Sequence, residues 1–290
     1  MTTARSPDHY IIDRIITSGL NESRIIFVTR PPLMRYKQAT QQAFAIGMIG
    51  LGIVGLVYGD FATVWHDAPA SLPGREILAY ASATLMLVCG IGLLSKRTEV
   101  LAARVLVPYW ALVVLLLEIP LVIRAPLVEM TWLNTAMITV VFTGAWVLTA
   151  ADTRALRIAQ LVFGAALIPI GLSHFVYVDL TAPLVPAWLP FHTGWAYLTG
   201  AAHIAAGLGV LLGIYPRLAA AMEAAMLSAF TGLVWIPAII ATPRTQNVWS
   251  EFTISWAISA GAWVVAASIA NKNPATSQQS PEPIVRRPAA

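Results

Sequence analysis

Three ionisable residues, His174, His203 and Glu223, lie within long apolar stretches of the sequence. Imidazole and carboxyl side chains are the groups that most often transfer protons in proteins. Inside a bilayer such a group costs about 2.5–3.5 kcal/mol or more, unless it is neutral, paired or hydrated. These residues are therefore candidates for a proton relay or for hydrogen bonds to a ligand within the membrane.

The same three residues have apolar counterparts in an earlier segment of the chain. Residues 72–151 and 189–268 align without a gap at an offset of 117, which indicates a tandem duplication. Pro, Trp and Gly residues stay in register between the two copies. Examples are Leu72-Pro73 with Leu189-Pro190, Pro120 with Pro237, Trp132 with Trp249, and Gly144 to Val147 with Gly261 to Val264. At this offset His174 aligns with Val57, His203 with Met86, and Glu223 with Leu106. Chemistry that needs ionisable groups is thus expected mainly in the second copy.

The spacing of these residues predicts a ladder rather than a cluster. At 1.5 Å rise per residue, His203 is expected near the centre of its span, His174 about 10 Å nearer the outer face, and Glu223 about 8 Å nearer the inner face. Ligands of one metal or haem must lie within a few ångströms of it, so no shared metal or haem site is expected. A ladder suits a proton path, and three unrelated interhelical hydrogen bonds are the alternative.

The connection that precedes Tyr197 is unusually apolar for an outer loop. It reads TAPLVPAWLPFHTGW and contains Trp188 and His192, while Asp179 comes shortly before it. We expect this loop to fold back onto the bundle or to lie in the membrane interface, at the outer mouth of the helices that carry His174 and His203. An apolar cover above polar groups can enclose a hydrophobic ligand with a polar head. For Asp179 and His192 the alternative is an ordinary solvated position at the membrane surface.

The elements that must position these residues are membrane helices. A mean hydropathy of +0.71, with 58% hydrophobic and 11% charged residues, is too apolar for a soluble domain. Eight stretches could cross about 30 Å of hydrocarbon. They lie near 42–59, 76–94, 101–121, 131–151, 157–176, 195–214, 217–240 and 250–270. The prediction is an all-α membrane protein of two four-helix repeats, which share one orientation because each has an even number of spans.

The basic residues predict the orientation. If both termini are cytoplasmic, fifteen of the eighteen Lys and Arg residues lie on the inner side, as the positive-inside rule requires. The pI of 9.4 then reflects topology and gives no reason to expect a nucleic-acid partner. We expect an interfacial N-tail (1–41), a first repeat (42–151), a second repeat (152–270) and a disordered C-tail (271–290), in a bacterial-type cytoplasmic membrane.

Several short motifs of the second copy resemble the DoxX/DoxD-like membrane protein family. In order, they are Gly171-Leu-Ser-His-Phe175, Val185-Pro-Ala-Trp-Leu-Pro190, Tyr197-Leu-Thr-Gly200, His203 to Gly209, and Arg217-Leu-Ala-Ala220. The resemblance covers about 155–245 and implies a four-span bundle, so that this chain would be a fused pair. It also implies respiratory or redox chemistry, as in the membrane subunit of a thiosulfate:quinone oxidoreductase. The family commonly carries Glu where this chain has His203.

Three functions follow from these patterns. The leading hypothesis is a membrane subunit that binds a quinone or similar lipophile, with His174 and His203 contacting its oxygens, because quinone reduction consumes protons. With a single cysteine, Cys89, and no haem, flavin or metal motif, electrons would come from a soluble or membrane partner subunit. A proton-coupled transporter or permeability factor and a structural assembly subunit are the alternatives. Enzymatic activity of the chain alone and homo-oligomer formation are left open.

Overall fold

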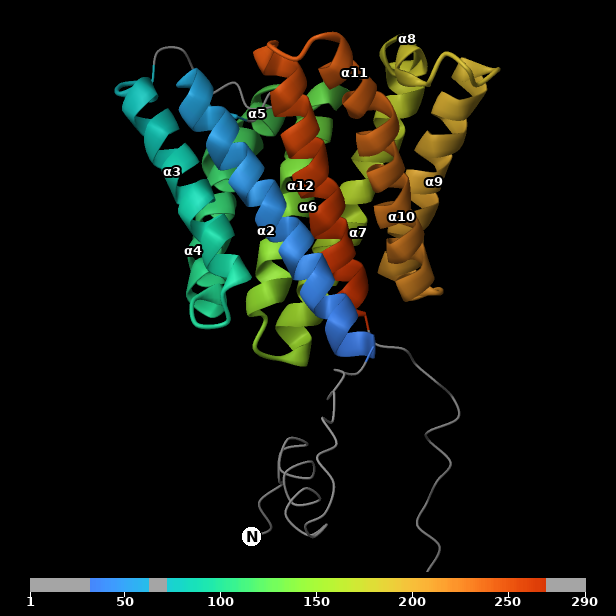
Figure 1. Ribbon diagram of the computed structural model, residues 1–290. Coiled ribbons are helices and arrows are strands. Elements are labelled where there is room, and N and C mark those ends of the chain that lie inside the picture. Colours follow the sequence, from blue (N-terminus) through green and yellow to red (C-terminus); the bar gives the residue numbers. More distant parts are fainter. Residues whose placement is uncertain (1–31, 63–71, 270–290) are drawn as a thin grey trace, which may run out of the picture. The chain divides into compact units, whose positions relative to one another are not determined.

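The described part of the chain is entirely helical and indicates a multi-pass membrane protein. The computed structural model describes residues 32–62 and 72–269, and those from Leu33 onward belong to one compact unit (Figure 1). Within these ranges there is no strand, and seven helices are long and apolar enough to cross a membrane. The predicted tails lie largely outside the described residues.

The helices follow one another with short connections. The first half contains α2 (Pro32–Tyr58), α3 (Arg75–Leu94), α4 (Glu99–Val113), the π-helix η1 (Val114–Glu118), α5 (Ile119–Arg124) and α6 (Glu129–Thr149). The second half contains α7 (Thr153–Val176), α8 (Val178–Thr181), the 3-10 helix η2 (Ala182–Leu184), α9 (His192–Leu212), α10 (Pro216–Phe230), the π-helix η3 (Thr231–Trp235), α11 (Ile236–Ala241) and α12 (Gln246–Ser268).

The first helix of the described residues, α2, starts earlier than the hydropathy pattern predicts. It begins at Pro32, about ten residues before the span expected near 42–59. Proline is well tolerated at a first helical position, because the N–H group that it lacks would have no helical partner there. No Gly or Pro follows until Gly47, so nothing in the sequence interrupts the helix between its polar start and its apolar body.

The stretch predicted as an eighth span, 250–270, falls mostly within α12, which is not among the seven apolar helices. This helix packs against α6 and α10, and every residue from Ala257 to Ala262 is buried. A helix that faces other helices needs small and hydroxyl-bearing side chains more than large apolar ones. Its central position therefore explains its lower hydropathy.

Helix boundaries in the two halves coincide at the offset of 117. The pairs α4 and α10, η1 and η3, and α5 and α11 begin and end at aligned residues. Each π-helix precedes an aligned proline, Pro120 or Pro237, and a widened turn relieves the clash of a proline ring with the preceding turn. The indole Nε1 of Trp132 donates to the Pro126 carbonyl (2.9 Å), and that of Trp249 donates to the Pro243 carbonyl (2.8 Å).

The two halves meet along α6 and α12. A Cβ atom on Gly144 would lie 2.8 Å from the Cα of Gly261, its aligned residue, so the two backbones touch here. On one side α7 packs against α6 and α9, and α10 packs against α9 and α12. On the other side α4 packs between α3 and α6. Three of the candidate residues, His174, His203 and Glu223, lie on α7, α9 and α10, and α9 packs against both of the other helices (Figure 1).

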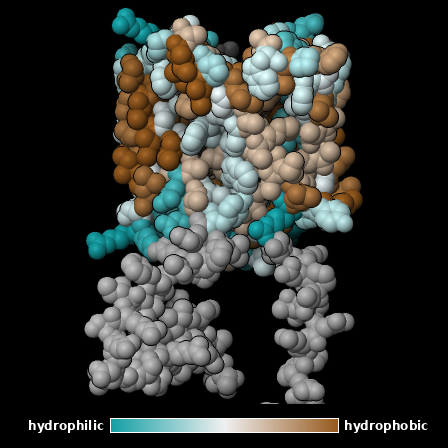
Figure 2. All heavy atoms as spheres, turned by 45° about the vertical axis from the view of Figure 1, so that its right-hand side comes forward, coloured by the Kyte–Doolittle hydropathy of each residue, from teal (hydrophilic) through white to brown (hydrophobic). Residues whose placement is uncertain are grey.

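The outer surface of the bundle is suited to contact with lipid. Figure 2 shows hydrophobic side chains over much of the side of the molecule, with hydrophilic ones more frequent toward its lower edge. Large aliphatic side chains are exposed on many helices, among them Ile77, Val88, Ile91, Leu101, Leu116, Ile123, Leu198, Leu212 and Ile240. Exposed apolar surface on this scale is expected of a protein surrounded by a bilayer.

Candidate functional site

A buried histidine–glutamate pair joins α9 to α10. The two helices are connected by a short turn at Gly213, so they run antiparallel and bring His203 opposite Glu223. His203 Nδ1 lies 2.7 Å from Glu223 Oε1, and the two residues are only 3% and 1% exposed. An imidazole and a carboxyl group in this arrangement share a proton, which lowers the cost of placing either in apolar surroundings.

The imidazole ring of His174, on α7, packs beside the His203 ring of this pair. Its ring centroid is 5.1 Å from that of His203, with the planes inclined by 53°, and the residue is 7% exposed. The Nδ1 atom of His174 lies 3.2 Å from the Ala196 carbonyl oxygen and 3.0 Å from Thr199 Oγ1, both on α9. We refer to His174, His203 and Glu223 as the histidine–glutamate cluster.

Two glycines allow His174 to approach α9. A Cβ atom on Gly171 would lie 2.5 Å from the Gly200 carbonyl oxygen, and one on Gly200 would lie 2.7 Å from the Cβ of His174. Any larger residue at either position would push α7 away from α9. Gly171 belongs to the motif Gly171-Leu-Ser-His-Phe175, so its local role is to set the distance between these two helices.

The predicted ladder is wrong, because the three residues form one cluster. The predicted depths were counted along each helix from its own ends. His174 lies two residues before the end of α7, yet it contacts Ala196 and Thr199, four and seven residues after the start of α9, so α9 extends past the end of α7. The contacts of His174 with Ala196 and Thr199 set the register. His203 follows Thr199 by four residues, about one turn, and so lies only about 6 Å below the level of His174. Glu223 then reaches His203 directly from α10.

One carboxyl oxygen of the cluster is left without a partner. Glu223 Oε2 is enclosed and forms no hydrogen bond with any residue in the described part of the chain. Such atoms are uncommon in native structures and often mark a place for water or a ligand. Within the same ranges, no group of three His, Cys, Asp or Glu side chains is arranged to hold a metal ion.

The other three predicted site residues lie apart from the cluster. Asp179 is exposed on α8, Trp188 is 72% exposed, and His192 is half-buried at the first position of α9. Eleven residues separate His192 from His203 along one helix, which is about 16 Å. The structure therefore does not bring these residues to the cluster.

The apolar loop expected to cover the cluster instead displays its aromatic rings at the surface. The elements α8 and η2 contact α9, but Trp188 and Phe191 extend outward, and Phe191 is 85% exposed. Phe191 also adopts a left-handed backbone conformation (φ 60°), where the aligned residue of the first half is Gly74 (φ 68°). A non-glycine residue in that conformation is disfavoured by roughly 1–2 kcal/mol. Exposed aromatic rings at the end of a membrane helix suit the lipid–water interface.

Sequence reasoning missed Thr199 and Phe230 as neighbours of the cluster. Thr199 Oγ1 lies 3.0 Å from both the Trp195 and the Ala196 carbonyl oxygens and donates its single hydrogen to one of them, which holds the hydroxyl oxygen beside His174. The ring of Phe230 packs edge-on at 6.3 Å from His174. Thr199 could have been found, because it precedes His203 by four residues and therefore shares its helix face.

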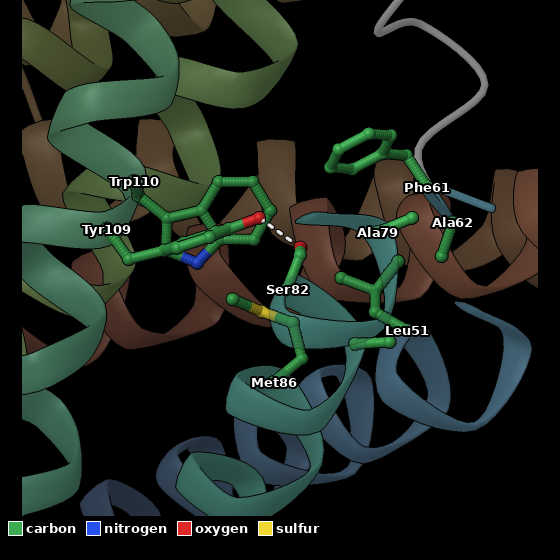
Figure 3. Close-up of a pocket in the computed structure, with 9 residues that line it drawn as sticks. Leu51, Phe61, Ala62, Ala79, Ser82, Met86, Tyr109 and Trp110 are labelled. Carbon is green, nitrogen blue, oxygen red and sulfur yellow. Dashed lines mark hydrogen bonds between the residues drawn. The ribbon is translucent and has the colours of Figure 1, made fainter. Parts of the chain in front are cut away.

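The aligned place in the first half has a different chemistry. A small cavity there is lined by Ser82, Met86, Tyr109 and Trp110, among other residues, as Figure 3 shows. Ser82 Oγ and Tyr109 Oη are 2.6 Å apart, and Met86 stands where the second half has His203. The residues that line this cavity include no His, Asp or Glu. Ser82 and Met86 of this cavity align with Thr199 and His203, but imidazole and carboxylate side chains occupy this place only in the second half.

Comparison with known families gave one match, which lies in the second half. A family model described as a domain of unknown function (DUF8561) matches residues 163–266. The matched range contains α9, α10 and α11 in full, most of α7 and α12, and every residue of the histidine–glutamate cluster. The comparisons with curated proteins and with solved structures gave no match.

Proposed function

We propose that this protein binds the head group of a quinone or similar lipophile at the histidine–glutamate cluster, as the membrane subunit of a redox system. The observation that carries the proposal is the buried pair of His203 and Glu223, at 2.7 Å, with the His174 ring beside it. A few polar groups inside an apolar bundle are what a lipophile with a polar head requires.

The chemistry of quinones fits the groups of the cluster. Reduction follows Q + 2e⁻ + 2H⁺ → QH₂, so a quinone site must pass two protons as well as two electrons. The His203–Glu223 pair and His174 can each accept and release one proton. In this proposal the electrons come from or go to a soluble or membrane redox partner. The resemblance of 155–245 to the DoxX/DoxD-like family supports the same assignment.

The compactness of the cluster favours a ligand site over a proton path. A proton-coupled transporter was expected to place titratable groups at three levels across the membrane. Here His174 and His203 differ by about one turn, and Glu223 contacts His203 directly. Groups gathered at one level can surround one head group, whereas a transmembrane path needs further relay groups above and below them.

In the proposed architecture, α12 is an eighth span and the protein consists of two four-helix units of one orientation. The 23 residues of α12 extend about 34 Å, which is enough to cross the hydrocarbon. The coincident helix boundaries of the two halves support the duplication. Basic residues at the α3–α4, α6–α7 and α9–α10 connections lie at one end of the bundle and support cytoplasmic termini. They are Lys96, Arg97, Arg154 and Arg217.

The proposal predicts that the purified protein carries a bound lipophile. The full chain would be isolated in native lipid discs, extracted, and assayed for quinones by mass spectrometry. We expect about one quinone, in either redox state, per protein in the wild type and little in the double variant His203→Met with Glu223→Leu, which introduces the aligned residues Met86 and Leu106. Tyr109→Phe, in the first-half cavity, is the matched control and should retain the quinone. Wild-type protein without enrichment over bulk lipid would contradict the proposal.

A further inference from the structure

We infer that the head group complementary to the histidine–glutamate cluster is a hydroxyl, as in a hydroquinone or another phenol, and not a carbonyl. This inference rests on the proposed function, because it specifies the ligand of the same site. It follows from the hydrogen-bonding state of the two ring nitrogens that no described residue occupies, Nε2 of His174 and Nε2 of His203.

The Nε2 atom of His174 is a hydrogen-bond acceptor. Its other nitrogen, Nδ1, lies 3.2 Å from the carbonyl oxygen of Ala196, which can only accept. The single hydroxyl hydrogen of Thr199 can be donated to the carbonyl oxygen of Trp195 or of Ala196, each 3.0 Å from Oγ1, and in either case its oxygen accepts from Nδ1. The proton of the neutral ring must therefore be on Nδ1. A neutral imidazole carries a single ring hydrogen, which leaves Nε2 with a lone pair.

The Nε2 atom of His203 is a hydrogen-bond donor. Burial at this depth favours a pair of His203 and Glu223 that has no net charge. Three arrangements have no net charge. A neutral carboxyl with its proton on Oε2 would leave a buried O–H donor unpaired, because Oε2 has no partner in the described structure. In the other two, either the ring is protonated and the carboxyl ionised, or both groups are neutral and the carboxyl donates to Nδ1. In both states one hydrogen lies between Nδ1 and Oε1, which are 2.7 Å apart, and a second hydrogen is on Nε2.

A hydroxyl group satisfies both nitrogens at once. Its oxygen accepts from His203 Nε2, and its hydrogen is donated to His174 Nε2. The ring centroids are 5.1 Å apart, and the rings form no hydrogen bond with each other in the described structure. A carbonyl oxygen can accept from His203 but leaves the lone pair of His174 facing another lone pair. The bound hydroxyl also completes a continuous hydrogen-bonded series from Glu223 through His203 and His174 to the Ala196 carbonyl.

The size of the preference follows from the cost of one unpaired buried acceptor. That cost corresponds to roughly a ten- to hundred-fold difference in affinity between a ligand that pairs the acceptor and one that does not. Sites built to hydrogen-bond a hydroxyl reject analogues that lack it for this reason. We therefore expect a hydroquinone to bind at least about ten-fold more tightly than the quinone with the same tail.

The test uses three probes that share one decyl tail: a benzoquinone, its hydroquinone, and the dimethyl ether of that hydroquinone. Binding to the full chain in lipid discs would be measured anaerobically by equilibrium dialysis against protein-free discs. The wild type should bind the hydroquinone most tightly. His174→Val removes the acceptor and keeps the His203–Glu223 pair, so it should reduce the ratio of hydroquinone to quinone affinity to about one, by the same estimate.

The outcomes separate this inference from the proposed function. Quinone binding as tight as that of the hydroquinone, or an ether that binds equally well, would overturn the inference and leave the site assignment standing. A ten-fold preference that persists in His174→Val would overturn the assignment of His174 as the acceptor. If no probe binds to the protein more than to empty discs, the proposed function fails. The wild-type comparison needs no variant to fold.

Discussion

Breaking the pair on α9 and α10 from one side is expected to destabilise the protein more than removing it entirely. His203→Met leaves the Glu223 carboxyl buried without a partner, which should lower the free energy of unfolding by about 3 kcal/mol. Glu223→Leu leaves His203 without its acceptor and should cost about 1–3 kcal/mol. The double variant replaces both groups by the aligned residues Met86 and Leu106, which are buried in the first half, and should approach wild-type stability.

A double-mutant cycle on unfolding in mixed micelles measures this coupling directly. Met86→Leu is the matched control, because it changes the aligned position where no pair exists and should cost less than about 1.5 kcal/mol. Hydrogen bonds between membrane helices average about 0.6 kcal/mol in such cycles. A coupling no larger than that would mean that the pair is an ordinary interhelical contact, and would contradict the account of a buried, proton-sharing pair.

Gly144→Ala is expected to disrupt the contact between the two halves. The added Cβ would lie 2.8 Å from the Cα of Gly261, and backbone atoms cannot rotate away as a side chain can. The helices α6 and α12 must therefore separate, at a cost of about 1–3 kcal/mol. Gly261→Ala should cost less, because its nearest neighbour, the Val140 carbonyl oxygen, is 3.1 Å away.

The control for this substitution is Gly232→Ala, whose Cβ would meet nothing within 4 Å. Alanine favours helix over glycine by about 1 kcal/mol, so this change should be neutral or stabilising. Thermal unfolding in detergent compares the three variants. Equal stability of Gly144→Ala and Gly232→Ala would show that α6 and α12 are not in the close contact described here.

The helices themselves could be predicted from apolar runs and their interruptions, but their ends and levels could not. The start of α2 at Pro32 depends on local backbone compatibility, which hydropathy does not measure. The burial of α12 depends on its neighbours, so its own sequence shows only a less apolar helix. The π-helices before Pro120 and Pro237 were also not predicted, although the two prolines align in the sequence.

For the site, the identity of the important residues was predictable and their geometry was not. His174, His203 and Glu223 stood out because their aligned residues are apolar. Their separation depends on the register of α7 against α9, which is set by the close contact of Gly171 with Gly200. Estimating depth from helix ends assumes that neighbouring helices end together, and α9 breaks that assumption. A contact with a backbone carbonyl, such as that of His174 with Ala196, cannot be predicted from residue types, because every residue has a carbonyl group.

The most direct test of the central claim combines the pair with ligand binding. The decyl hydroquinone would be titrated into lipid discs that contain wild-type protein or the double variant His203→Met with Glu223→Leu, after equal thermal stability has been verified. We expect the hydroquinone to bind saturably to the wild type and not to bind to the folded double variant. Undiminished binding to the double variant would show that the buried pair is not needed to bind the ligand, and would contradict the proposal that the pair forms the head-group site.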